Sequence, residues 1–281
     1  MAKLTVSKIK HVLTADIDIT QRFDVKVLDE YVNTCITAAQ NALQSAVPPG
    51  FSDFHRDVLK RVMEGMRSAH KSIRILLRDG PSASSIDAMT VARLQLEALY
   101  SFCFLLQGSH NVALFLKSGW KKQYVRFLLM REECINLPRF DAYVNKVAAP
   151  SHEEMRKVIG VTDAEKLTIE SDELGTLLPA GFKREVIVEF PTPGKVIDRI
   201  VNLDQKGMLE RLYPECQWLC SFAHGDQNAS ILRTALDDRT PASVRPSPDV
   251  REDIFQRHIA LQCHFCCAGS DGSIGYLPKE H

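Results

Sequence analysis

The sequence predicts a mainly helical fold, an all-α bundle of four or five core helices with one small extended insertion. Three observations support this class. Apolar residues recur at three- and four-residue steps through four long stretches. Strong breakers, Pro48-Pro49-Gly50 and Gly80-Pro81, close two of these stretches. Only one segment, 183–190, alternates in the manner of a strand.

The first half of the chain is predicted to form the core. The four expected helices cover residues 23–46, 53–78, 84–107 and 110–133. The first two should form an antiparallel hairpin, because a short loop joins them. The fourth helix is expected to complete a four-helix core.

The middle of the chain is predicted to contain shorter helices and one extended segment. Short helices are expected at 138–148 and 151–159, the second opened by a capping box of Ser151 and Glu154. Residues 183–190, KREVIVEF, then read as a short strand or an extended arm before Pro191. A lone strand needs a partner. That partner would be residues 166–171 or the same segment of a second copy.

Helical character returns in the last third of the chain. Helices are expected at 207–223, 228–236 and 249–267, with a proline-punctuated linker at 240–248. We therefore predict a single domain over residues 1–281. Its core would comprise about 22–136 and 205–267, and the insertion would comprise about 137–204.

Composition narrows the class of protein. Hydrophobic residues make up 45% and charged residues 25%, so the chain is not predicted to be mostly disordered. Equal numbers of basic and acidic residues, 35 each, leave no broad positive field for nonspecific binding of nucleic acid or anionic membranes. No apolar stretch resembles a signal sequence or a membrane span, and the eight cysteines are expected to be reduced. A cytoplasmic protein is expected.

The segment 88–107 contains the most informative pair of residues. It is apolar on nearly every helical face, yet it carries Arg93 and Glu97 one turn apart. A buried charge persists only when it is paired. The pair is therefore either a structural tie that fixes helix register or the anchor of a ligand or catalytic centre.

A second group of polar residues lies at 213–225. Tyr213, Cys216, Cys220 and His224 fall near one face of a helix, with Ser221 beside them. His224 precedes Gly225 at the expected helix end, where the helix dipole favours an imidazolium. His224 would be a capping or core residue, or else a general acid or base.

These residues together resemble a bacterial family of helical proteins known as a domain of unknown function. The resemblance covers roughly Val58 to Gly225 and depends on an Arg-x-x-x-Glu helix followed by Gly207, Tyr213 and Ser-x-x-His-Gly. It implies that five residues converge in space: Arg93, Glu97, Tyr213, Ser221 and His224. The long segment 160–194 and the cysteine-rich tail depart from the family pattern, and the family supplies no activity to transfer.

Two functions remain open on these residues. In the first, the polar centre belongs to a ribonuclease-type effector of a defence or toxin system, with histidine as acid or base and arginine stabilising phosphate charge. The Arg-to-His spacings of such toxins, Arg251 to His258 and Arg257 to His264, are as frequent here as chance predicts and do not favour it. In the second, the chain is a non-enzymatic binding or scaffold protein, and the same residues only hold helices together.

Metal binding is the remaining candidate chemistry. Cys263, His264, Cys266 and Cys267 form the most metal-like string, and Cys216 with Cys220 could complete a zinc site. Both stretches read as helix, whereas structural zinc usually takes its ligands from turns or knuckles. We therefore expect no zinc and no other cofactor, and a packed face of thiols instead.

The expected partner follows from the segment 183–190. Its unpaired edge would be exposed in a helical monomer, and natural proteins cover such edges. We therefore expect a homodimer or a partner protein at this segment. RNA stays a candidate ligand under the first function, and no membrane association is expected.

Overall fold

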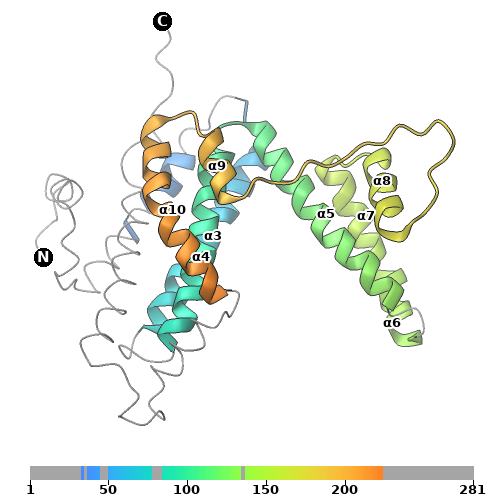
Figure 1. The fold of residues 1–281 in the computed structure, drawn as a ribbon, viewed down its shortest axis with the longest axis horizontal. Helices are drawn as coiled ribbons and strands as arrows, with labels where there is room; N and C mark the ends of the chain where they lie inside the picture. The colour runs from blue at the N-terminus through green and yellow to red at the C-terminus, as the bar shows by residue number, and fades with distance from the viewer. Residues whose placement is uncertain (1–32, 35–36, 45–49, 78–83, 134–136, 224–281) are drawn as a thin grey trace, which may run out of the picture. The chain divides into compact units, whose positions relative to one another are not determined.

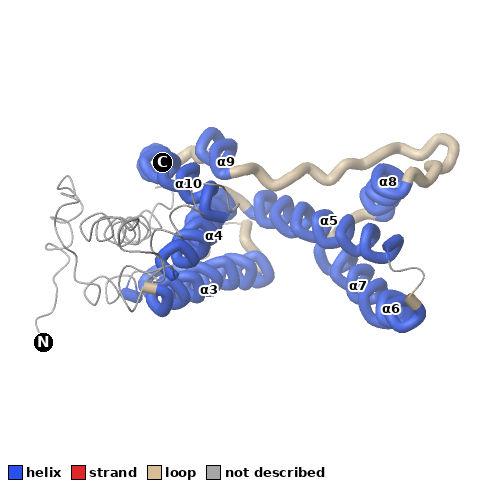
Figure 2. Tube along the Cα trace, turned by 60° about the horizontal axis from the view of Figure 1, so that its bottom comes forward, coloured by secondary structure: helices blue, strands red, loops and turns tan. Residues whose placement is uncertain are grey.

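The structure, a computed structural model, describes residues 33–34, 37–44, 50–77, 84–133 and 137–223 (Figure 1). Residues 53–223 of these ranges form eight α-helices and one π-helical turn, residues 33–34 and 37–44 are also helical, and the described ranges contain no β-strand (Figure 2). The predicted all-α class is confirmed. The remaining predicted helices, 228–236 and 249–267, lie outside the described residues, as does most of 23–46.

The chain divides into two compact units. Of the described residues, unit 1 comprises those within 1–107 and 193–281, and unit 2 comprises those within 108–192. The middle unit therefore begins and ends earlier than the insertion expected at 137–204. Each unit is described by itself below.

Besides the helical residues 33–34 and 37–44, unit 1 contains four described helices. These are α3 (Asp53–Leu76), α4 (Ser84–Leu105), α9 (Pro193–Arg199) and α10 (Leu203–Ala223). The start of α3 is fixed by a capping box, in which the Ser52 hydroxyl accepts from the His55 backbone N–H and the His55 imidazole accepts from the Ser52 N–H. The predicted helices at 53–78 and 84–107 are thus present with nearly the expected bounds.

Helix α4 is the central helix of unit 1. It packs against α3, α9 and α10, and it contributes apolar side chains on several faces. This explains why its sequence is apolar almost all round. The fully buried side chains of unit 1 include Leu59, Ile73, Met89, Leu96, Leu105, Leu209 and Leu219.

Unit 2 begins with the long helix α5 (Ser109–Glu133). A second helical run covers residues 138–159 as α6 (Pro138–Tyr143), the π-helical turn η1 (Val144–Ala148) and α7 (Ala149–Ile159). This run has no break at Ser151, so the predicted capping box of Ser151 and Glu154 is wrong. Ser151 instead lies in the first turns of α7, where its backbone is already helical.

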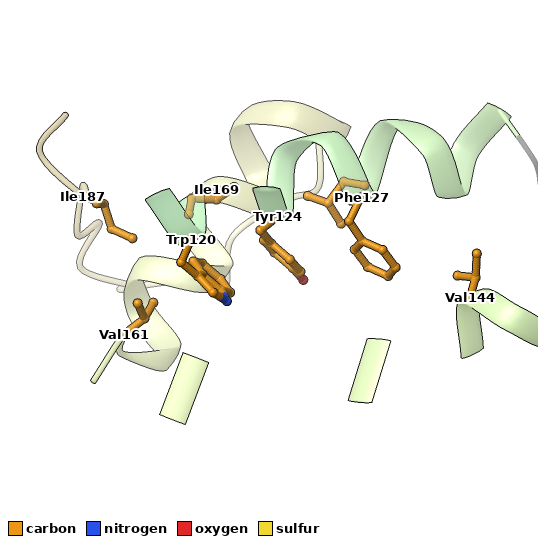
Figure 3. Packing of buried hydrophobic residues seen from close by; sticks show 8 residues of the cluster. Trp120, Tyr124, Phe127, Val144, Val161, Ile169 and Ile187 are labelled. Atoms are coloured by element: carbon orange, nitrogen blue, oxygen red, sulfur yellow. The ribbon is translucent and has the colours of Figure 1, made fainter. Parts of the chain in front are cut away.

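The fourth predicted helix, α5, belongs to unit 2 and packs within that unit. One face of α5 carries Trp120, Tyr124, Phe127 and Leu128, and these pack against residues of unit 2 (Figure 3). The Trp120 and Tyr124 rings stack with centroids 4.6 Å apart, and the Trp120 indole N–H donates to the His152 carbonyl at 3.1 Å. A large aromatic face of this kind needs its own apolar partners, which the following segments supply. They include Val144, Val161, Ile169 and Ile187.

Helix α7 is followed by α8 (Asp163–Leu174), and specific capping residues end the first helix and begin the second. Gly160 ends α7 in the left-handed conformation, φ 76°, which favours glycine. Thr162 then caps α8 in a reciprocal capping box with Glu165. Residues 166–171 therefore lie inside a helix, and the expectation of a strand there is wrong.

Residues 183–190 form an extended arm and not a strand. Ile187 is only 2% exposed and packs into the aromatic core, whereas Val186 and Val188 face solvent. The arm is held by side chains: the Glu185 N–H donates to the Thr168 hydroxyl at 3.1 Å, and the Phe190 N–H donates to the Ser118 hydroxyl at 2.9 Å. The alternating sequence thus reflects packing on helices within unit 2. The expected partner at this arm stays a prediction.

No helix in the described ranges combines the length and the apolar character needed to cross a bilayer.

Candidate functional site

The predicted polar centre lies between α4 and α10. Arg93 is 8% exposed, and its guanidinium lies 2.6 Å from the Glu97 carboxylate one turn further along α4. The Glu97 side chain is 43% exposed, so only one member of this ion pair is buried. The buried guanidinium of Arg93 is therefore paired with a carboxylate that is in contact with solvent.

The second contact of Arg93 crosses to α10. Its Nη1 donates to the Cys216 carbonyl at 2.5 Å and lies 2.5 Å from the Cys216 sulfur. Burial, only partly offset by the Arg93 charge, raises the pKa of the Cys216 thiol to about 11. Cys216 is therefore a neutral hydrogen-bonding partner at physiological pH and not a thiolate nucleophile.

Tyr100 makes a parallel link two turns further along α4. Its side chain is 1% exposed, and its hydroxyl donates to the Leu209 carbonyl at 2.7 Å. Burial raises the pKa of this phenol well above its usual range, and the nearby Cys216 and Tyr213 raise it further. A phenol with so high a pKa is a poor general acid or base, but it is a stable hydrogen-bond donor.

Tyr213 packs against α9. A Cβ added at Gly194 would lie 2.9 Å from the Tyr213 hydroxyl oxygen, so the Tyr213 side chain occupies the space that a larger residue at position 194 would need. Tyr213 is close enough to Tyr100 to influence its pKa, and no hydrogen bond joins it to Arg93 or Glu97. Its place in the structure is the α9–α10 junction.

Of the five predicted site residues the structure pairs two, Arg93 and Glu97, and it places Tyr213 apart from them at the α9–α10 junction. The side chain of Ser221 and all of His224 lie outside the described residues. Sequence reasoning treated Cys216 as a possible metal ligand, and it did not find that Cys216 is the acceptor for Arg93. The helical spacing that places Cys216 three residues after Tyr213 was the available signal, because it predicts that the two side chains lie near one face of the helix.

The geometry limits what this centre can do chemically. Both terminal nitrogens of Arg93 are occupied, Nη1 by Cys216 and Nη2 by Glu97. A phosphate that took the place of the Cys216 carbonyl on Nη1 would leave a buried acceptor unpaired. The arrangement therefore resembles a tie between helices more closely than an open anion site.

Metal ligands do not converge in the part of the chain that the structure describes: no group of three or more His, Cys, Asp or Glu side chains could hold an ion there. Cys263, His264, Cys266 and Cys267 lie outside the described residues. The expectation that the protein binds no zinc stays a prediction.

Unit 2 contains a second charged cluster, which sequence reasoning did not single out. Arg156 is 8% exposed, and it pairs with Glu153 at 2.6 Å and Asp163 at 2.8 Å, while its Nη1 donates to the Val161 carbonyl at 2.8 Å. Hydrogen bonding to Arg156 is the main cause that lowers the Glu153 pKa to about 2. The i, i+3 spacing of Glu153 and Arg156 was a visible signal. These contacts fasten α7 to the start of α8.

Three comparisons with known proteins gave no match: no family model, no curated protein and no solved structure corresponds to this chain.

Proposed function

We propose that this chain is a non-enzymatic binding or scaffold protein in which Arg93 and Glu97 hold α4 and α10 in register. The observation that carries the proposal is that both terminal nitrogens of Arg93 are bound within the protein, Nη1 by a carbonyl and a thiol of α10 and Nη2 by Glu97. A catalytic arginine needs a donor that faces its substrate. This one faces the neighbouring helix.

The chemistry of the surrounding groups agrees with this proposal. Cys216, Cys103 and Tyr100 all have raised pKa values, chiefly because they are buried. Enzymes usually tune acids, bases and nucleophiles toward the working pH, and here burial moves the groups away from it.

The surface of unit 2 supports a binding role. Several large apolar side chains there are at least half exposed, among them Tyr143, Val147, Met155, Val158, Val186 and Val188. Such side chains gathered in one small unit are typical of surfaces that contact another protein.

The test is an assay of RNA hydrolysis with the full chain. Wild-type protein and the variants Glu97→Gln and His224→Ala are incubated with mixed-sequence RNA, and their melting temperatures are measured in parallel. We expect no cleavage above the buffer control for any of the three. Cleavage by the wild type that disappears in a His224→Ala variant of unchanged melting temperature would overturn the proposal and establish the ribonuclease-type effector.

A further inference from the structure

The helical run 138–159 in unit 2 presents two rows of side chains, an inner row that faces the core and a largely apolar outer row that is exposed. The inner row packs into the core and comprises Val144, Ala148, His152, Arg156 and Ile159, all buried or half-buried. The outer row comprises Tyr143, Val147, Ser151, Met155 and Val158, all exposed. Each residue of the outer row directly precedes one of the inner row, so the two faces are about 100° apart around the helix.

The π-helical turn η1 keeps both rows continuous. In an ordinary α-helix of 3.6 residues per turn, residues four apart are displaced slightly around the helix axis at every step. The π-helical turn at 144–148 has more residues per turn, so it offsets this displacement. Residues before and after η1 therefore stay aligned on one face. Among the outer row, Tyr143, Val147, Met155 and Val158 are between 50% and 61% exposed. An apolar face of this length is unusual on a helix whose other face already fills a core.

The outer row is almost symmetric about Ser151. The steps from Tyr143 to Val158 are four, four, four and three residues, with the smallest side chain in the middle. In an antiparallel pair of two such helices related by a twofold axis at Ser151, Val147 of one copy lies opposite Met155 of the other. Tyr143 then lies opposite Val158. The small serine allows the two helix axes to approach closely where they cross.

The charges beside the outer row fit the same pairing. Lys146 and Glu154 are exposed, lie on the same flank of the row and make no ion pair within the described part of the chain. In a twofold antiparallel pair, equal flanks meet. Lys146 of each copy therefore comes within about one turn of Glu154 of the other, which gives two equivalent ion pairs.

We propose that the outer row of residues 138–159 is a homodimer interface, in which two copies of this chain pair their helices antiparallel around Ser151. The inference rests on the proposed binding or scaffold function and names its partner as a second copy. It places the interface on the helical run and not on the arm 183–190. The self-complementary arrangement is what favours a second copy, because an unrelated partner would not require the row to match its own reverse.

The main test is the mass of the full chain in solution, measured by sedimentation at several concentrations. We expect the mass of two chains at high concentration. Met155→Lys should raise the dissociation constant about thirtyfold or more, because it places a charge in the centre of an apolar contact. Asn145→Lys, on the opposite side of the same helical run from the outer row, should leave the constant unchanged. Since both positions are exposed, circular dichroism should show the same fold in both variants.

Charge reversal tests the register. Lys146→Glu alone and Glu154→Lys alone should each weaken the dimer, and the double variant should restore it. A second check is oxidative cross-linking of Ser151→Cys, which should give a covalent dimer that neither the parent chain nor Asn145→Cys gives. A chain that is monomeric at all concentrations, or a double variant that fails to recover, would overturn the inference.

The alternatives give different results. If the dimer survives Met155→Lys and is broken by Val186→Lys, the interface is the arm 183–190 and the inference is wrong. If the chain is monomeric, something else covers the outer row, and the inference is wrong while the proposed function stands. If RNA is cleaved in a His224-dependent manner, the proposed function fails and the dimer is judged by its own measurements.

Discussion

Single residues in unit 1 show how burial makes a polar side chain a structural hydrogen-bonding group and not a reactive one. Arg93, Tyr100 and Cys216 are all nearly inaccessible, and each is hydrogen-bonded between α4 and α10. Glu97 differs because its side chain reaches solvent. The ion pair therefore couples a buried cation to a hydrated anion, which avoids most of the cost of burying two charges.

The thiols give a direct prediction at this scale. Burial raises the pKa of Cys103 to about 12 and that of Cys216 to about 11. At neutral pH we expect both to react with iodoacetamide at least about a hundredfold more slowly than an ordinary thiol. Cys220 is partly exposed and should react faster. Mass spectrometry of the modified peptides measures this order, and rapid labelling of Cys216 in folded protein would contradict it.

Glu153 gives a prediction about acid stability. Its pKa is lowered from 4.5 to about 2, mainly by hydrogen bonds from Arg156. A lowered pKa in the folded state means that the stabilisation is present above about pH 5 and is lost as the pH falls toward about 2. Glu153→Gln should therefore show a smaller decrease in melting temperature over this range than the wild type. The exposed Glu173→Gln serves as control and should follow the wild type; equal acid sensitivity of Glu153→Gln would contradict the assignment.

At the scale of helices and loops, the junction of α9 and α10 depends on one glycine. A Cβ at position 194 would meet the Tyr213 hydroxyl at 2.9 Å, whereas a Cβ at Gly207 in α10 would meet nothing within 4 Å. We expect Gly194→Ala to lower the free energy of unfolding by about 1–3 kcal/mol. Gly207→Ala should raise it by about 0.5–1 kcal/mol, because alanine is the better helix former.

Urea denaturation of both variants measures the difference. The double variant Gly194→Ala with Tyr213→Phe removes the clashing oxygen and should recover part of the loss. If Gly194→Ala is as stable as the wild type, α9 does not pack on Tyr213 as described.

The helices were the part of the fold that the sequence predicted best. Apolar periodicity and breakers placed α3, α4 and α5 within a few residues, because local pattern and helix caps determine these features. The conformation of segment 183–190 was harder to predict from the sequence. Its alternation is real, but Ile187 packs on helices, and hydroxyls of Thr168 and Ser118 replace the hydrogen bonds of a neighbouring strand. Only the tertiary structure supplies those partners.

Part of the candidate site could likewise be predicted from the sequence, and part of it could not. That Arg93 is buried and paired with Glu97 followed from the sequence, since both lie on one apolar helix. That Arg93 also binds Cys216 did not, because the two residues are 123 positions apart. No local pattern specifies a contact over that separation.

For the whole molecule, we assign a structural role to the polar contacts of unit 1 and partner binding to unit 2. In unit 1 the buried polar contacts join α4 to α10. In unit 2 the core is aromatic, and the outer row of the helical run faces outward. The proposed scaffold assigns stability to the first set of contacts and partner binding to the second. These roles are separable by mutation, because variants of one unit should leave the other function intact.

The central claim is that Arg93 is a structural tie, and urea unfolding of Arg93→Ala beside Glu97→Gln tests it most directly. Loss of the buried guanidinium removes the link to α10 and leaves a cavity, so Arg93→Ala should lower the free energy of unfolding by about 2–4 kcal/mol. Glu97→Gln should cost less than about 1 kcal/mol, because its side chain is partly hydrated. An Arg93→Ala protein as stable as the wild type would contradict the account.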